Sequence, residues 1–440
     1  MNYSAKDIKK KLIDCIKDVG KISWLFAQNP DKNFTRDRKL PFEHMIKSIL
    51  CMSGGSLTNE LIDYFNISSN MPSTSAFVQQ RSKILPEAFE TLFHMFNENV
   101  TADLKYRGYR LFAVDGSDLH IPTDKNDIES YYPGTNGQKP FNLLHLNTLY
   151  DLCNNIYVDA IVQKSENEHK AFVDMVDRLD VKNAVFIGDR GYEAYNSMAH
   201  IQEKGCKFLI RIKDINSNGI ARGLDLPDEE EFDLPLHLSL TRKQTNMDKE
   251  LCKNKNNYKY LANSTPFDYL PKHTRKHIPI KAYELFMRIV RFKITDDTYE
   301  LVATNLTCEE FPPAELKKLY AMRWGIETSY RGLKYTVGLS YFHSKKVECN
   351  IQEIFARLTM YNFTQLVIST TVMHQKNRTY SYKVNFAAAA HICRKYIRIH
   401  ISPPNIEALL LKHVVPIRPN RKQQRKMTAK TAICFTYRIA

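Results

Sequence analysis

The sequence predicts an α/β protein whose mixed central region is flanked by two helical segments. Apolar residues recur at helical spacing through residues 1–105. Short apolar runs alternate with amphipathic stretches through residues 106–213, a rhythm typical of a sheet covered by helices. Strand-like runs between polar turns fill residues 214–300, and residues 346–440 are helical and basic. We therefore expect an α/β core interrupted by a β-rich insertion.

The composition describes a globular protein without a membrane partner. The 440 residues are 43% hydrophobic and 11% aromatic, enough for roughly two or three domains. The first residues are charged and lack the apolar segment of a secretory signal, and no apolar run is long enough to span a membrane. The nine cysteines form no CxxC pair, which predicts reduced thiols in the cytoplasm rather than disulfides or a zinc site.

The net charge of +15 is concentrated near the C-terminus. Residues 354–440 contain 15 Lys and Arg and a single acid, Glu407. Tyr380, Tyr382 and Tyr396 lie among these cations. The sign and length of this segment favour a polyanionic partner, with nucleic acid preferred over a membrane surface.

The N-terminal segment, residues 1–105, is predicted to be a helical DNA-binding domain. Two of its short helices are joined by NISSNMP and can form a helix-turn-helix. In that interpretation Gln79, Gln80 and Arg81 open the recognition helix and enter a DNA groove. A plain helical bundle with exposed polar residues is the alternative interpretation.

The core is predicted to contain three strands, a helix, a strand, a helix and a strand. The apolar runs RLFAVD and NAVFIGD end in Asp115 and Asp189. These two acids are therefore expected at the carboxyl ends of neighbouring strands, where open α/β sheets place their sites. The acids Glu166 and Glu168 are interpreted as surface residues at a helix start.

A single helix is predicted for YAMRWGIETSYRGLK, residues 320–334. Steps of three, four and seven residues place Tyr320, Arg323, Glu327 and Lys334 on one face of it. A solvated salt-bridge face is the alternative, since Arg323 and Glu327 form an ordinary i,i+4 pair. Trp324 lies off this face and is interpreted as a core residue.

The residue types in this region suit metal-dependent phosphodiester chemistry. Mg²⁺ and Mn²⁺ prefer carboxylate oxygens, and two such ions about 3.5–4 Å apart can serve an in-line displacement. Asp115, Asp189 and Glu327 can hold such a pair if the fold brings them together. Arg323 and Lys334 can contact phosphates, one as a planar fork and the other as a point charge.

At these residues the chain resembles the DDE transposases of bacterial insertion sequences. The resemblance is strongest to the insertion-sequence-four-like branch, which carries the signature Y-(2)-R-(3)-E-(6)-K. Residues 320–334 match the spacing of this signature in full. VDGSD at 114–118 is similar to the family's first acidic strand end, and GDRGYEAY at 188–195 is similar to its second acidic turn. The resemblance extends over residues 110–345.

The resemblance implies a ribonuclease-H-like catalytic core, formed by residues 106–213 and 301–345 and interrupted by a β-rich insertion, residues 214–300. The N-terminal domain would bind the DNA ends, and residues 346–440 would form the helical basic C-terminal region. The implied activity is cut-and-paste transposition: DNA cleavage at terminal inverted repeats, then strand transfer into target DNA.

The resemblance also implies the cofactors, the assembly and the location of the protein. Each site would use two Mg²⁺ ions, for which Mn²⁺ would substitute, and the protein would form a homodimer on DNA at the bacterial nucleoid. Asp115, Asp189 and Glu327 would bind metal, and Tyr320 would hydrogen-bond a phosphate.

Further residues are candidates for DNA contact. Related enzymes form a DNA hairpin with a base stacked on an aromatic side chain. Tyr299 occupies that place here, although the family favours Trp; a strand tyrosine packed on a neighbour is the alternative. Arg211 can contact backbone phosphates or be simply exposed. Asp118 and His120 offer a weaker, transition-metal interpretation.

Two other functions remain open. A Mg²⁺-dependent nuclease or resolvase can use the same core without strand transfer. An inactive DNA-binding remnant can act as a repressor, although an intact acid triad argues against that class.

Overall fold

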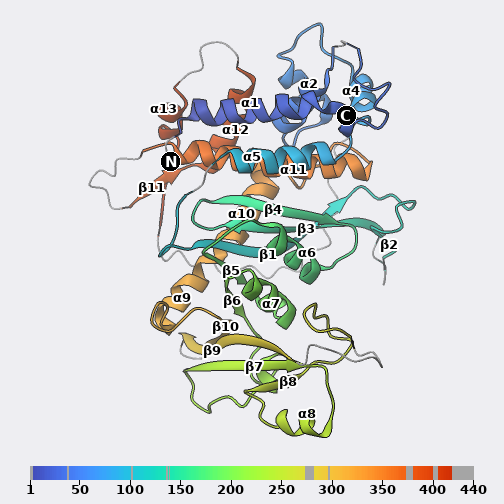
Figure 1. Cartoon of the computed structure of the whole chain (residues 1–440). Coiled ribbons are helices and arrows are strands. Elements are labelled where there is room, and N and C mark those ends of the chain that lie inside the picture. The colour runs from blue at the N-terminus through green and yellow to red at the C-terminus, as the bar shows by residue number, and fades with distance from the viewer. Residues whose placement is uncertain are drawn as a thin grey trace.

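Helices at the two ends of the chain form one layer above a long sheet (Figure 1). The computed structural model describes residues 3–36, 39–100, 103–134, 137, 139–272, 282–295, 298–372, 380–399 and 405–418. The N-terminal elements are α1 (Ala5–Lys21), η1 (Ser23–Phe26), α2 (Phe42–Cys51), α3 (Leu57–Tyr64), α4 (Thr74–Arg81) and α5 (Glu87–Asn99). Ser4, Ser56 and Ser73 cap α1, α3 and α4 by accepting hydrogen bonds from backbone N–H groups of the first turn.

The C-terminal segment contributes to the same layer. Its elements are α11 (Val347–Ser369), β11 (Tyr382–Val384), α12 (Phe386–Arg398), α13 (Ile406–Leu411) and β12 (Val414–Pro416). Helix α11 contacts α1, α2, α5 and α12, so the first and last parts of the chain share a core. Within the described residues, no helix is long and apolar enough to cross a membrane.

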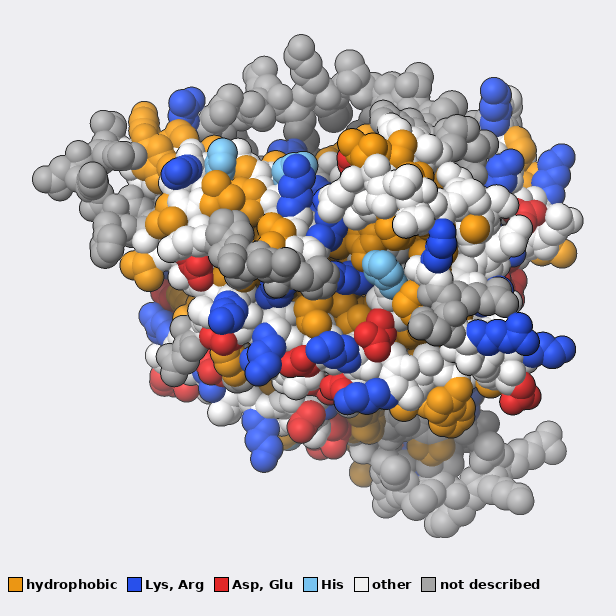
Figure 2. All heavy atoms as spheres, turned by 90° about the horizontal axis from the view of Figure 1, so that it is seen from above, with side chains coloured by type: hydrophobic (Ala, Val, Ile, Leu, Met, Phe, Trp, Pro, Cys, Tyr) orange, Lys and Arg blue, Asp and Glu red, His pale blue; other side chains and the backbone are white. Residues whose placement is uncertain are grey.

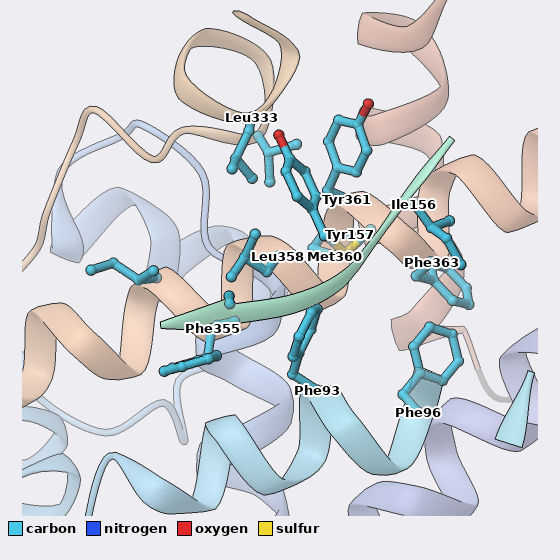
Figure 3. Close-up of a cluster of buried hydrophobic side chains, with 14 of the residues drawn as sticks. Phe93, Phe96, Ile156, Tyr157, Leu333, Phe355, Leu358, Met360, Tyr361 and Phe363 are labelled. Carbon is cyan, nitrogen blue, oxygen red and sulfur yellow. The ribbon is translucent and has the colours of Figure 1, made fainter. Parts of the chain in front are cut away.

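Aromatic residues join α11 to its neighbours above and below. Phe93 of α5 lies 6.0 Å from Phe355 of α11 between ring centroids. Figure 3 shows this pair beside the strand that carries Tyr157, whose ring centroid is 4.9 Å from that of Tyr361. The helical layer therefore rests directly on the sheet.

The sheet has ten strands among the described residues, in the order β2-β3-β1-β5-β6-β10-β9-β7-β8, with β4 paired to β3. The strands are β1 (Arg110–Ile121), β2 (Tyr131–Tyr132), β3 (Phe141–Asp151), β4 (Ile156–Gln163), β5 (Ala184–Gly188), β6 (Lys207–Arg211), β7 (Phe232–Thr241), β8 (Tyr258–Tyr260), β9 (Tyr283–Thr295) and β10 (Thr298–Thr304). The other elements from residue 110 to 337 are α6 (Glu168–Arg178), η2 (Arg190–Tyr192), α7 (Tyr195–Glu203), η3 (Ala221–Gly223), α8 (Asn246–Leu251), α9 (Pro313–Met322), α10 (Trp324–Arg331) and η4 (Gly332–Val337).

The predicted order of three strands, helix, strand, helix and strand is confirmed by β1, β3, β4, α6, β5, α7 and β6. The mixed α/β class is confirmed as well. The strands of the expected insertion continue the same sheet, because β10 pairs antiparallel with β6 at its edge. A single sheet therefore runs from the helical layer to β7 and β8 at the far end of Figure 1.

Side chains along β1 point alternately into two hydrophobic cores, one on each face of the sheet. Leu111 and Ala113 belong to the core that includes the helical layer and α10. Phe112 and Val114 belong to the opposite core, which includes α6 and α7. Because side chains alternate along a strand, residue 115 faces α10 and residue 116 faces α6. This alternation sets the geometry of the candidate site.

Candidate active site

Asp115 lies within β1, where the strand loses one of its two partners. The prediction of a strand that ends at Asp115 was wrong, since β1 continues to Ile121 through antiparallel pairing with β3. The parallel pairing with β5 stops earlier, at Ala113 and Ile187. One edge of β1 is therefore open beside Asp115. The end of the neighbouring strand, and not the end of β1, makes room for a site.

Tyr330 links helix α10 to β1 by a hydrogen bond. The Tyr330 hydroxyl donates to the backbone oxygen of Asp115 at 3.0 Å and lies 2.9 Å from the Thr148 hydroxyl on β3. Tyr330 is buried, and Glu327 precedes it by less than one turn of α10. The helix thus carries Glu327 to the face of the sheet that holds Asp115.

Asp189 follows β5 directly and shapes the turn behind it. Its carboxylate accepts a hydrogen bond from the Gly191 N–H at 2.7 Å and caps η2. A Cβ on Gly188 would lie 3.1 Å from Cβ of Tyr192 and 3.4 Å from Cγ1 of Val114. Glycine therefore lets the turn pack closely on β1. Asp189 is at the strand end that the sequence predicted.

The three acids interact electrostatically. Burial, together with the carboxylates of Asp189 and Glu327, raises the pKa of Asp115 to about 7, although Arg323 and the hydrogen bond from the Gly116 N–H oppose the increase. Asp115 is consequently costly to ionise unless a cation offsets its charge. The three acids thus lie on β1, at the end of the neighbouring strand β5 and on α10, and the charges of Asp189 and Glu327 act on Asp115.

The predicted single helix over residues 320–334 is interrupted. Helix α9 ends at Met322, α10 begins at Trp324, and η4 is a π-helical turn. Around Arg323 the backbone bonds span three residues, from Arg323 N–H to Tyr320 O and from Ile326 N–H to Arg323 O. The break and the wider turn depart from the uniform helix that the one-face prediction assumed. Arg323 nevertheless contacts Glu327 and lies 5.8 Å from the centroid of the Tyr320 ring.

Two signature side chains are buried with unsatisfied polar atoms. Among the described residues, the Tyr320 hydroxyl and Arg323 Nε have no hydrogen-bond partner, and the two residues are 4% and 7% exposed. Arg323 Nη2 donates to Glu327 Oε1 at 2.6 Å, as an i,i+4 pair predicts. Lys334 Nζ donates to the backbone oxygen of Asp118 at 3.2 Å.

Arg211 and Tyr299 lie at a separate small cavity of about 150 Å³, which Arg190 also lines. Arg211 is 3.4 Å from Glu300 in an ion pair. The Tyr299 hydroxyl donates to Glu230, and the guanidinium of Arg291 lies 4.5 Å from the centroid of its ring. Tyr299 therefore has packed partners, and its ring is partly exposed.

The residues expected to open a recognition helix instead end helix α4. The helix begins at Thr74 after the Ser73 cap, so Gln79, Gln80 and Arg81 form its last turn. Arg81 is 2% exposed and is bound to α11, which corrects its expected place on a DNA-facing surface. Gln80 is half-buried and donates to Leu40 O at 3.2 Å, whereas Gln79 is exposed.

Sequence reasoning missed several neighbours of Asp115. Glu168, interpreted as a surface acid, lies against Gly116 with its Oε1 2.3 Å from the position of a Cβ there. Asp118 pairs with His145 at 2.7 Å rather than with His120. The pairing of β1 with β3 reveals the Asp118–His145 contact, because these residues are opposite in register, and the position of α6 reveals the contact of Glu168 with Gly116.

Trp324 was expected in the core, and that prediction was wrong. Its side chain is 52% exposed, beside Arg323, whose guanidinium lies 5.7 Å from the ring centroid. The break before α10 turns it outward. Trp324 therefore lies on the surface next to the acids.

The donor set suits a hard divalent cation, although the carboxylates are not gathered around one point. Asp115, Asp189 and Glu327 offer only oxygen ligands, and the pKa of Asp115 is raised, chiefly by burial, despite the nearby charge of Arg323. Within the described residues, no three acidic, His or Cys side chains lie close enough together to hold one ion. Arg323 Nη2 meanwhile engages Glu327 Oε1.

Comparisons with known proteins show the family of the chain. Residues 106–363 match the family model described as "Transposase DDE domain". The chain is similar to "Transposase InsG for insertion sequence element IS4" of Escherichia coli (strain K12), with 22% identity over 358 residues, covering 78% of this chain and 73% of that protein. A chain in the "Cryo-EM structure of piggyBac transposase synaptic complex with hairpin DNA (SNHP)" matches with a TM-score of 0.42 and 10% identity, covering 97% of this chain and 88% of that one. The family match includes all three acids and more than half of the chain, which therefore belongs to the transposase DDE domain family and is a DDE transposase.

Proposed function

We propose that this transposase moves a DNA element by cutting at its terminal inverted repeats and joining the 3′ ends to target DNA. The observation that carries the proposal is the placement of the three acids on adjoining elements: Asp115 lies at the open edge of β1, Asp189 follows the neighbouring strand β5, and Glu327 lies on the helix that Tyr330 bonds to Asp115. The family membership and the similarity to a transposase of an insertion sequence support the same activity. We further propose a ribonuclease-H-like core of residues 106–213 and 301–345, with residues 214–300 as its insertion.

In this proposal Asp115, Asp189 and Glu327 hold two divalent cations, Mg²⁺ or Mn²⁺. When bound, such ions activate the attacking oxygen and stabilise the leaving oxygen of a phosphodiester. Glu327 would share its carboxylate between these cations and Arg323, whose Nη2 donates to Glu327 Oε1 at 2.6 Å. Arg323 would also bind a DNA phosphate with its planar guanidinium.

The unsatisfied atoms beside the acids support a phosphate ligand. The Tyr320 hydroxyl and Arg323 Nε are buried donors without partners among the described residues. A buried donor of this kind costs about 1–3 kcal/mol until a ligand satisfies it. Phosphate oxygens are suitable acceptors, and Lys334 lies at the same edge of β1 through its bond to Asp118 O. We therefore assign these three residues to the DNA backbone.

The proposed partner is double-stranded DNA, both at the element ends and at the target, bound by a homodimer. Residues 1–105 and 346–440 are proposed to bind DNA together, because their helices form one layer. Figure 2 looks down on this layer and shows Lys and Arg side chains spread over it among hydrophobic ones. Their charge suits contact with phosphates.

The test uses DNA that carries the sequences flanking the gene. Asp115→Asn, Asp189→Asn and Glu327→Gln keep the side-chain shape but remove a charged ligand. We expect each to reduce Mg²⁺-dependent cleavage by about 10³-fold or more, with end binding retained, since metal stabilisation is worth several kcal/mol.

The matched control is Asp180→Asn, which alters an exposed acid away from the three acids. It should cleave as the wild type does. Substantial nicking by Glu327→Gln would remove that residue from the site. Cleavage by the wild type without joining to a second duplex would instead favour the nuclease alternative, and binding without cleavage would favour the repressor.

A further inference from the structure

Glu168 and Asn147 converge on the α6 face of β1 at Gly116, whereas the preceding residue, Asp115, faces α10. The two faces meet at the edge of β1 that β5 leaves open. Gly116 and Asn147 are opposite in the register of β1 and β3. A Cβ on Gly116 would lie 2.3 Å from Glu168 Oε1 and 3.3 Å from Asn147 Oδ1. Glycine at this position therefore leaves the space in which both oxygens approach the strand. Any side chain there would displace the end of Glu168.

The two oxygens lack a hydrogen-bond donor. Asn147 is 1% exposed, and its Oδ1 has no partner among the described residues, while its amide nitrogen donates to Gln163 at 3.2 Å. The half-buried Glu168 carboxylate makes no hydrogen bond or ion pair with any residue that the structure describes. Buried acceptors normally have partners. A ligand from outside the chain is therefore the natural source of the donor.

The surroundings identify that ligand as a cation. Glu168 Oε2 lies 3.9 Å from the position of a Cβ on Gly191, in the turn that Asp189 caps. Burial raises the pKa of Glu168, and the carboxylates of Glu166, Asp189 and Asp118 raise it further, while His145 opposes them. The space is thus bordered by negative charge and by a neutral oxygen. A hydrated divalent cation carries both the charge and the O–H donors that are missing.

We propose that Glu168 is a positioning residue that, together with Asn147, accepts hydrogen bonds from the hydrated divalent cation held by Asp115 and Asp189. This inference rests on the proposed function of those two aspartates. Mg²⁺ loses its water reluctantly and keeps several water molecules in protein sites. Acceptors beyond the direct ligands orient such sites, and their loss typically weakens metal binding about 10–100-fold.

The test measures Mn²⁺ affinity of the full chain from the electron paramagnetic resonance signal of free Mn²⁺. Glu168→Gln should weaken Mn²⁺ binding about tenfold without changing the thermal unfolding midpoint. Asp180→Asn is the matched control, because this acid is exposed and is not among the charges that act on Glu168, and its affinity should stay within about twofold of the wild type. Gly116→Ala should reproduce the Glu168→Gln loss by displacing the carboxylate, and the two changes together should add little.

Each result bears on a separate part of the inference. Asp115→Asn should weaken Mn²⁺ binding more than Glu168→Gln does. If Asp115→Asn weakens Mn²⁺ binding and Glu168→Gln leaves it unchanged, the role of Glu168 is overturned while the proposed function stands. If Asp115→Asn is also neutral, or the wild type binds no Mn²⁺, the proposed metal site itself fails. A lower unfolding midpoint of Glu168→Gln with unchanged Mn²⁺ affinity would make Glu168 a structural partner of Asn147 and overturn the inference.

Discussion

Arg81 and Glu353 form a buried ion pair that joins α4 to α11, with 2.8 Å between Arg81 Nη1 and Glu353 Oε1. Their side chains are 2% and 1% exposed. Glu353 also accepts from the His343 backbone N–H at 3.1 Å and lies 3.6 Å from Arg357. Arg81 further donates to the backbone oxygen of Cys349. The network ties the first part of the chain to the last.

Removing the charge of Glu353 should destabilise this junction. Glu353→Gln leaves Arg81 and Arg357 buried without a counter-charge, and breaking such a pair typically costs about 3–5 kcal/mol. Urea unfolding at pH 7 should therefore show a much lower midpoint than in the wild type. Glu348→Gln, an exposed position in the first turn of α11, is the control and should be neutral. Equal midpoints for the two variants would contradict the assignment.

The same network predicts a pH dependence. Burial opposes ionisation of Glu353, but His343, Arg81 and Arg357 outweigh it and hold its pKa well below the ordinary value. The pKa of Glu353 is lower in the folded state than in the unfolded state. The stabilisation from its charge is therefore complete above the unfolded-state pKa of about 4.3 and is lost as the pH falls below that value. The difference in stability between wild type and Glu353→Gln should accordingly shrink between pH 5 and pH 3. A difference independent of pH would contradict this.

Arg81 and Gln79 should separate structural from DNA-reading roles. Arg81→Ala removes one ion-pair partner of buried Glu353 and should therefore lower the stability of the protein. It should not alter the preference for end sequence over random DNA. Gln79 is exposed, so Gln79→Ala tests the helix-turn-helix interpretation. A lost base contact should reduce that preference by about 1–3 kcal/mol in competition binding assays. Uniform weakening on both DNAs would indicate a backbone contact, and no change would favour the plain bundle.

Tyr299 should matter only if a DNA hairpin forms. On a pre-nicked element end, Tyr299→Ala should retain the nick and reduce hairpin yield about tenfold, since base stacking is worth about 1–3 kcal/mol. Tyr299→Phe keeps the ring but loses the hydrogen bond to Glu230, and it should behave as the wild type does. A normal hairpin yield with Tyr299→Ala would show that Tyr299 has no role in hairpin formation. No hairpin from the wild type would exclude the mechanism for this protein.

The basic C-terminal segment should contribute to the salt dependence of DNA binding. Residues 419–440 lie outside the described part of the chain and contain six Lys and Arg. A truncation should begin at residue 419, because deletion from residue 412 would remove β12, which pairs with β11. We expect the slope of log affinity against log salt to flatten by up to about 5, as fewer counterions are released. A full-length variant with these cations changed to Gln should match the truncation, whereas an unchanged slope would assign the segment to other contacts.

The sequence by itself determined the order of elements and the chemical character of the site. Local periodicity specified β1, β5 and α6, because strand and helix patterns depend on neighbours within a few residues. The spacing of residues 320–334 likewise gave the Arg323–Glu327 pair, since i and i+4 are adjacent on any helical turn. The family resemblance, which the match over residues 106–363 confirms, depended on such short motifs.

Only the tertiary structure decided which distant groups meet. Arg81 pairs with Glu353, 272 residues away in the sequence. Glu168, at the start of α6, lies against Gly116 of β1. Local sequence does not encode these contacts, because they depend on the register of β1 with β3 and on the place where β5 ends. The structure also shows that the helix is interrupted at Arg323 and that Trp324 is exposed. Burial and partner charge, which decide whether a polar residue is structural or functional, are properties of the assembled fold.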